Sequence, residues 1–273
     1  MATRRARGTQ DSTRSIAHRA VGHALEQDAL APGSPFAPRD ACGTGFIAQR
    51  DGVRSHEVVS LALEALARMA HRGGAGTDLS GDGAGLLLQF PAPFLRAVAA
   101  DLDLAIPPEA PFAVGMFFLP AEAGARERAR AMVTEVLAAD GLPYLGWREV
   151  PTDPTALGAT SAASCPYIAQ CYIGCPSAIA DHEAFERELY LARRDMEHRA
   201  TALGLTGFYC CSLSHRTIVY KALLTGTQLP RFYADLRDPR LTSAIAVFHE
   251  RYATNTLPRW ELAQPFRFLA HNG

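Results

Sequence analysis

Residues 1–41 differ from the rest of the sequence, and they limit where a globular fold can begin. This segment is polar and rich in arginine up to about Ala20, and Pro32, Pro35 and Pro38 then follow within seven residues. Proline fixes φ and lacks a backbone donor, which excludes a helix and most sheet pairing there. We therefore expect residues 1–41 to be an extended leader or propeptide, with the globular part beginning near Asp40.

The composition is that of an ordinary globular protein. Hydrophobic residues make up 48% and charged residues 20% of the 273 residues, and the formal net charge is −1. A balanced charge argues against a protein that binds nucleic acid mainly by neutralising phosphates. No run of about 18 apolar residues predicts a membrane span. Lys221 is the only lysine among the 27 basic residues, which we attribute to genome composition.

The leader also bears on location. It has no apolar stretch of the kind that a secretory signal needs. We therefore expect a reduced, cytoplasmic protein. Its six cysteines are then mostly small hydrophobic residues rather than disulfide partners.

Hydrophobic periodicity predicts strands and helices that are interleaved after the leader. A helix over 55–72 would be capped by Ser55 and ended by Gly73. The order of the elements predicts a layered α/β or α+β domain. Strands are expected at 45–48, 86–90, 112–119, 167–173, 208–212, 217–224 and 243–248, and further helices at 121–139 and 182–202.

Two patterns resemble common motifs without fitting them. Residues 43–48 match the dinucleotide-binding pattern G-x-G-x-x-A, but that motif needs a strand before it and a helix N-terminus within it. Cys171-x3-Cys175 has the spacing of half a structural zinc site. Cys210 and Cys211, however, are neighbours on an expected strand and would point to opposite faces. We expect buried thiols and no metal site.

Cys42 stands directly between the leader and a Gly-x-Gly turn. Cleavage before Cys42 would give this residue a free α-amine with a pKa near ~7.7–8.0, which can accept a proton as an amide nitrogen cannot. Nucleophile and base would then belong to one residue, as in N-terminal threonine enzymes. Gly43 and Gly45 would let the chain pass close to a substrate. Without cleavage, Cys42 is a buried cysteine at the start of a strand.

Attack on a carboxamide also needs oxyanion donors and a group that holds the substrate. Asn272 offers a side-chain amide and Gly273 an unobstructed backbone N–H. Arg251 offers a fork that suits an α-carboxylate, and Thr254 and Asn255 lie beside it. Taken singly, an Asn-Gly pair is a turn and such an arginine is a surface ion pair.

In combination and in this order, the motifs resemble the glutaminase domains of glutamate synthases, which are class II glutamine amidotransferases of the N-terminal nucleophile type. The resemblance covers about residues 40–273. The stretch from Ser212 to Lys221 favours glutamate synthase over other class II members. The motifs are Cys42–Ala48, His71-Arg72-Gly73, Gly81-Asp82-Gly83-Ala84-Gly85, Arg251–Thr256, Gln264-Pro265-Phe266-Arg267 and His271-Asn272-Gly273.

The resemblance implies a four-layer α/β/β/α sandwich for residues 42–273. It implies that Cys42 becomes the mature N-terminus and attacks the side-chain amide of L-glutamine, releasing ammonia. Asn272 and Gly273 would form the oxyanion hole, and Arg251 would hold the substrate carboxylate. Arg72 would help to orient the cysteine. The Gly81–Gly85 run would be a tight turn near the site.

Two departures from the family pattern matter. Thr44 takes the place of an aliphatic residue, and the acidic residue that binds the substrate's α-amino group is expected beyond Gly273. We therefore expect an N-terminal fragment of the domain that is poorly active alone. Its partners would be downstream synthase domains that aminate 2-oxoglutarate and carry FMN and an iron–sulfur cluster, together with an electron-transfer subunit or ferredoxin.

Two alternatives remain open from the sequence. One is another class II amidotransferase, which would carry a phosphoribosyl-binding or sugar-isomerase domain downstream. The other is a non-enzymatic, cysteine-rich scaffold stabilised by a metal ion bound through residues such as Cys171 and Cys175.

Overall fold

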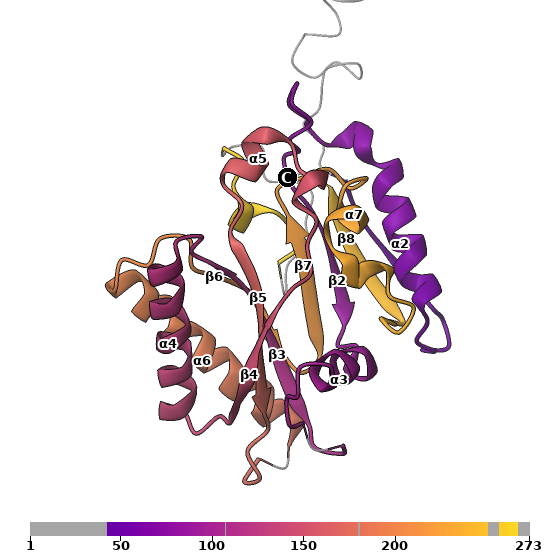
Figure 1. Ribbon diagram of the computed structural model, residues 1–273. Helices are drawn as coiled ribbons and strands as arrows, with labels where there is room; N and C mark the ends of the chain where they lie inside the picture. The colour runs from indigo at the N-terminus through magenta and orange to yellow at the C-terminus, as the bar shows by residue number, and fades with distance from the viewer. Residues whose placement is uncertain (1–42, 107, 180, 251–256, 267–273) are drawn as a thin grey trace, which may run out of the picture. The chain divides into compact units, whose positions relative to one another are not determined.

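The computed structural model describes residues 43–106, 108–179, 181–250 and 257–266, all within the unit formed by residues 42–273. They form two four-stranded antiparallel sheets with helices packed against them, which confirms the α+β class (Figure 1). The strands are β1 (Gly43–Ala48), β2 (Ala84–Gln89), β3 (Phe112–Leu119), β4 (Tyr144–Glu149), β5 (Tyr167–Gly174), β6 (Tyr209–Ser214), β7 (Thr217–Ala222) and β8 (Ile245–Glu250).

Helices connect most of these strands. No helix among the described residues is both long and apolar enough to cross a membrane. The α-helices are α2 (His56–Arg68), α3 (Ala92–Ala100), α4 (Ala123–Ala139), α5 (Ala159–Ala163), α6 (His182–Ala202) and α7 (Leu229–Phe232). Short 3-10 turns are η1 (Ala70–Arg72), η2 (Pro154–Ala156), η3 (Ala234–Arg237) and η4 (Trp260–Leu262).

The first sheet has the strand order β1-β8-β2-β7. Strand β8 lies between β1 and β2 and pairs antiparallel with both. Helix α2 connects β1 to β2 in sequence. In this register Glu250, the last residue of β8, stands opposite Gly43 of β1 on one side and Ala84 of β2 on the other. Helix α2, capped by the Ser55 hydroxyl, which accepts from the Val58 N–H, packs on β8, β1 and β2.

The second sheet has the order β4-β5-β3-β6. Its chain path is β3-α4-β4-η2-α5-β5-α6-β6. The first and third of these strands, β3 and β5, are neighbours, and α4 and α6 form the two crossovers, which is the split β-α-β arrangement. Helices α4 and α6 pack on each other and on β4 and β6. Figure 1 shows the two helices together on the left, beside these strands.

The second sheet separates two hydrophobic cores because alternate residues of its strands point to opposite faces. Met116 of β3 belongs to the core that also contains Leu66 of α2 and Leu86 of β2. The next residue, Phe117, belongs to the core formed with α4 and α6. Strand β7 lies against β3 and β6, and the core that contains Leu86 and Met116 takes residues from both sheets.

A buried polar network connects the second sheet with β7 and the segment that follows it. Arg148 of β4 donates from Nη2 to Asp235 Oδ1 at 2.7 Å and from Nη1 to Asp235 Oδ2 at 2.7 Å. Its Nη1 also donates to Gln170 Oε1, and the Tyr220 hydroxyl donates to Asp235. Burial opposes the charge of Arg148, but its hydrogen bonds to Asp235 and the charge of that residue raise its pKa overall. The pair therefore ties the second sheet to the segment that follows β7.

All seven strands and three helices expected from the sequence are present, with small differences at their ends. The expected helix 55–72 ends at Arg68, and its last turn is the separate 3-10 turn Ala70–Arg72. Helix α3, strand β4 and the short helices α5 and α7 were not expected.

Replacing Asp235 with Asn should destabilise the fold strongly. The change leaves the buried Arg148 charge without a counter-ion, and breaking a buried ion pair from one side costs about 3–5 kcal/mol of unfolding free energy. Urea denaturation followed by circular dichroism measures this loss. The double variant Arg148→Met/Asp235→Leu should recover most of it, because no charge is left buried. A loss below about 1 kcal/mol, typical of an exposed pair, would contradict this assignment.

Candidate functional site

The candidate site is the end of the first sheet at which β1 begins and β8 ends. Gly43 stands opposite Glu250 there, and Ala84 stands opposite Glu250 on its other side. In sequence, Cys42 directly precedes Gly43 and Arg251 directly follows Glu250. The predicted site residues Cys42, Arg251, Thr254, Asn255, Asn272 and Gly273 lie outside the described residues.

Arg72 is the predicted site residue that the structure describes. It ends the 3-10 turn after α2 and is exposed, and its backbone N–H donates to the Met69 carbonyl at 2.7 Å. The side chain of Met69 lies against Gly43, where an added Cβ would come within 2.9 Å of the sulfur. Met69 therefore contacts the Arg72 turn through its carbonyl and the start of β1 through its side chain.

The structure shows a packing reason for glycine at positions 43 and 45, while the expected close approach to a substrate stays a prediction. A Cβ on Gly45 would lie 2.7 Å from the Phe248 ring. Both glycines thus make room for side chains of this protein. The residues 43–48 form one continuous strand with no helix N-terminus inside it, so the dinucleotide-binding interpretation fails as the sequence predicted.

The loop after Arg72 is anchored by Asp78. This carboxylate accepts from the Thr160 N–H at 2.8 Å and from the Ser80 hydroxyl at 2.8 Å. These hydrogen bonds, that from Thr160 foremost, hold the pKa of Asp78 well below its usual range. Gln228 adds a bond from its side-chain amide to the Leu79 carbonyl at 3.1 Å. The loop is thereby joined to α5 and to the turn after β7.

The Gly81–Gly85 run is a crowded turn that leads into β2. A Cβ on Gly81 would lie 2.2 Å from the Leu224 carbonyl carbon, and Gly83 has a φ of 127°. The Asp82 N–H donates to the Gly74 carbonyl at 3.1 Å. This backbone donor is already used within the protein, which fits the expected tight turn.

Lys221 is buried at 1% exposure on β7. Its ammonium donates to the Glu261 carbonyl at 2.8 Å and to the Tyr209 hydroxyl at 3.1 Å, and it lies 4.7 Å from the centre of the Phe266 ring. Burial lowers the pKa of Lys221 to about 8. The side chain holds residues 260–266 against the sheet, a structural role that was not predicted from the sequence.

The Ser-x-Arg-Thr stretch that favoured glutamate synthase forms the turn between β6 and β7. The Ser214 hydroxyl accepts from the Arg216 N–H at 2.9 Å and the Thr217 N–H at 3.2 Å, and it donates to Glu186 of α6 at 2.7 Å. These bonds fix a tight turn between strands of different sheets. These hydrogen bonds give the residue pattern a role in folding.

The described cysteines are free thiols in apolar surroundings. Cys210 lies in the core beneath α4 and α6, and Cys211 lies in the other core, which confirms that they point to opposite faces. Burial raises the pKa of both to about 12, so neither thiol is a reactive nucleophile. Among the described residues, no group of three or more His, Cys, Asp or Glu side chains is placed to hold a metal ion.

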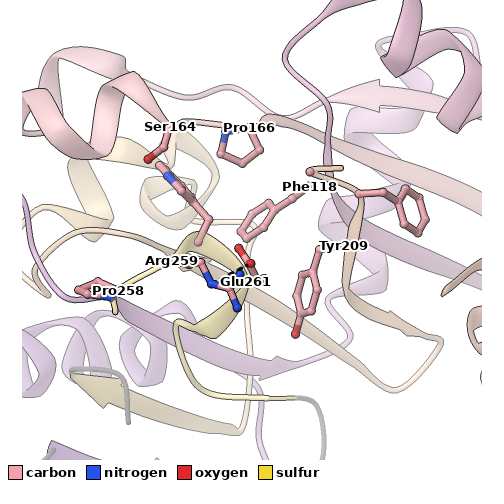
Figure 2. Close-up of a pocket in the computed structure, with 10 residues that line it drawn as sticks. Phe118, Ser164, Pro166, Tyr209, Pro258, Arg259 and Glu261 are labelled. Carbon is pink, nitrogen blue, oxygen red and sulfur yellow. Dashed lines mark ion pairs between the residues drawn. The ribbon is translucent and has the colours of Figure 1, made fainter. Parts of the chain in front are cut away.

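A separate pocket of about 290 Å³ lies beside the segment that Lys221 holds (Figure 2). Arg259 and Glu261 form an ion pair of 3.3 Å in it. Arg72, the predicted site residue that the structure describes, is not among the described residues that line the pocket. Its lining comprises Phe118, Ser164, Pro166, Gly207, Phe208, Tyr209, Pro258, Arg259, Trp260 and Glu261.

Comparison with known families agrees with this arrangement. The family model for class-II glutamine amidotransferases matches residues 42–273. The chain therefore belongs to the class II glutamine amidotransferase family.

Glutamate synthases are among the curated proteins that this chain resembles, and it matches their N-terminal part. It is 41% identical over 240 residues to the glutamate synthase [NADPH] large chain of Bacillus subtilis, covering 88% of this chain and 16% of that protein. It is 45% identical over 236 residues to ferredoxin-dependent glutamate synthase 2 of Synechocystis, covering 86% and 15%. The glutamate synthase [NADPH] large chain of Azospirillum brasilense is 41% identical over 242 residues, covering 88% and 16%. The chain thus spans about a sixth of the length of these relatives.

Replacing Lys221 with Met should release the segment 260–266. The variant removes both hydrogen bonds and the contact with the Phe266 ring, while Met retains most of the buried apolar contact. Hydrogen exchange at residues 260–266 should become faster, with little change in β2 and β8. Arg50→Met, at a side chain that is 92% exposed, is the control. Unchanged exchange in the 260–266 segment would show that Lys221 does not hold it.

Proposed function

We propose that this chain is the glutaminase part of a glutamate synthase, with Cys42 as the nucleophile that attacks the side-chain amide of L-glutamine. The observation that carries the proposal is the pairing of Gly43 with Glu250. Consecutive Cα atoms are about 3.8 Å apart, so Cys42 and Arg251 are each one residue from a paired position at one sheet end. Family membership supports the same assignment.

The chemistry follows from the free α-amine that Cys42 gains when residues 1–41 are removed. The amine takes the thiol proton, and the thiolate attacks the side-chain carbonyl carbon of glutamine, forming a C–S bond and an oxyanion. Collapse of this intermediate breaks the C–N bond, and the α-ammonium returns the proton to the departing nitrogen as ammonia leaves. The product is a γ-glutamyl thioester.

Hydrolysis of the thioester completes the reaction. The same amine takes a proton from water, which attacks the thioester carbonyl and forms a second oxyanion. The C–S bond then breaks, glutamate is released and the thiol regains its proton. Each nucleophile is thus activated by a base held within the same residue.

The other predicted residues have roles that fit this sequence of steps. The Asn272 side-chain amide and the Gly273 N–H stabilise both oxyanions. Arg251 binds the α-carboxylate through its fork of donors, with Thr254 and Asn255 beside it. Arg72 orients Cys42, a role supported by the contact that Met69 makes with both the Arg72 turn and Gly43.

The proposal extends to the whole protein. Two antiparallel sheets with helices packed on them support a complete domain with the four-layer α/β/β/α sandwich of N-terminal nucleophile hydrolases. We infer that the ammonia aminates 2-oxoglutarate in downstream synthase domains, in the cytoplasm, and that FMN and an iron–sulfur cluster belong to those domains. The curated relatives are NADPH and ferredoxin-dependent enzymes by name, so an electron-transfer subunit and ferredoxin are the two candidate donors.

Cys42→Ala in the full-length enzyme should abolish glutamate formation from glutamine and leave ammonia-dependent formation intact. The reason is that the substitution removes the nucleophile without touching the synthase site. Cys165→Ala is the matched control, because burial raises the pKa of the Cys165 thiol to about 11 and makes it unreactive. Glutamine-dependent activity that survives in Cys42→Ala would contradict the proposal.

Active full-length enzyme should begin at Cys42, because only a free α-amine can serve as the base. Intact-mass measurement and N-terminal sequencing check this directly. An enzyme that turns over glutamine with residues 1–41 still attached would exclude the α-amine mechanism, even if Cys42 is the nucleophile.

A further inference from the structure

The carboxyl group of Glu250 is buried at the centre of the candidate site. The residue is 1% exposed and ends β8, directly before Arg251 in sequence. Its backbone stands between Gly43 and Ala84 in the sheet. A buried carboxyl is costly unless neighbouring groups compensate it, so its contacts indicate what it does.

The side chain contacts two glycine backbones from different parts of the chain. Its Oε2 atom accepts from the Gly226 N–H at 2.8 Å. A Cβ on Gly73 would lie 2.5 Å from its Oε1, and a Cβ on Gly226 would lie 2.5 Å from its Oε2. Gly73 directly follows Arg72, and Gly226 belongs to the turn after β7. The carboxyl group of this β8 residue is therefore hydrogen-bonded to the β7 turn and packed against the Arg72 turn.

The surroundings of Glu250 favour its neutral form. Burial and the nearby Asp82 carboxylate raise the pKa of Glu250 to about 8, although the Gly226 N–H acts in the opposite direction. Asp82 is the charged group that faces Glu250 from the turn before β2. From helix α2, the apolar side chain of Leu66 packs on Gly226 beside the Glu250 carboxyl. Gly73 and Gly226 have no side chains, so they present only backbone to this carboxyl.

We propose that Glu250 is a positioning residue for the glutaminase reaction, whose side chain fixes the Arg72 turn and the Gly226 turn to the sheet end formed by Gly43 and Glu250, the sequence neighbours of Cys42 and Arg251. This inference rests on the proposed function for its catalytic consequence. Its structural part, the attachment of two turns to β8, rests on the contacts alone.

The buried position of Glu250 predicts how activity with glutamine depends on pH. Ionisation of Glu250 near pH 8 places a second negative charge beside Asp82 in a buried position, which should loosen both turns. The α-amine of Cys42 works in the opposite sense, because it becomes a base as pH rises through ~7.7–8.0. Activity with glutamine should therefore rise and then fall with pH, and Glu250 should cause the alkaline fall.

The pH dependence of stability should reveal the titration of Glu250 independently of enzyme activity. The pKa of Glu250 is raised on folding from the 4.5 of an unperturbed glutamate, so the folded state binds more protons than the unfolded state between these values. The contribution of Glu250 to the free energy of unfolding is therefore fully present below pH 4.5 and is lost as the pH rises through about 8.

The test uses the full-length enzyme with Glu250→Gln, Glu250→Ala and the exposed control Glu57→Gln. Glu250→Gln keeps a neutral acceptor of similar shape, so kcat with glutamine at pH 7 should stay near that of the wild type, and the alkaline fall should disappear. Glu250→Ala should lower kcat roughly tenfold through the lost hydrogen bond, with a smaller change in KM. Ammonia-dependent activity should not change in any variant.

The outcomes separate this inference from the proposed function. An alkaline fall that persists in Glu250→Gln, or an unchanged kcat in Glu250→Ala, would overturn the role of Glu250. A wild type that uses ammonia but not glutamine would overturn the proposed function instead. The melting temperature would then still test the role of Glu250. The melting temperature of Glu250→Gln should exceed that of the wild type by an amount that grows between pH 5 and pH 9. A difference that stays constant over this range would refute the inference.

Discussion

The antiparallel pairing of β8 with both β1 and β2 is the constraint on which the rest of the candidate site depends. It places Gly43, Glu250 and Ala84 in one row, although Glu250 lies more than 160 residues from the other two in sequence. A slip of one residue would turn Phe248 and Glu250 to the opposite face. Phe248 would leave the core it shares with Leu86, so burial of apolar side chains enforces the same register that assembles the site.

The elements that the sequence predicts well are those with strong local patterns. The buried run Phe112–Leu119 and the long helix His182–Ala202 match expectation closely. Strand β4 was missed because Gly146 has a φ of 150° and the register shifts between Tyr144 and Gly146, which interrupts the alternation that marks a strand. Helix α3 was missed because Pro91 and Pro93 at its start resemble a loop, although proline suits a first turn.

The candidate site was predictable in a different way. The ordered motifs around Arg72 and the Gly81–Gly85 run identify residues that the structure does place near one sheet end. The groups that hold this end together were not predictable, because their burial depends on segments distant in sequence. Glu250 is buried only because Gly73 and Gly226 approach it, and Lys221 only because residues 260–266 fold over it. The functions of the six predicted residues outside the described part stay predictions.

The burial of Lys221 has a chemical consequence for the whole 273-residue sequence. A reagent that acylates amines ordinarily labels many surface lysines, but here the single ε-amine is 1% exposed. The other aliphatic amine of this 273-residue polypeptide is the α-amine at its N-terminus. Amine acylation thus becomes a chemical reporter of which residue is first in the chain.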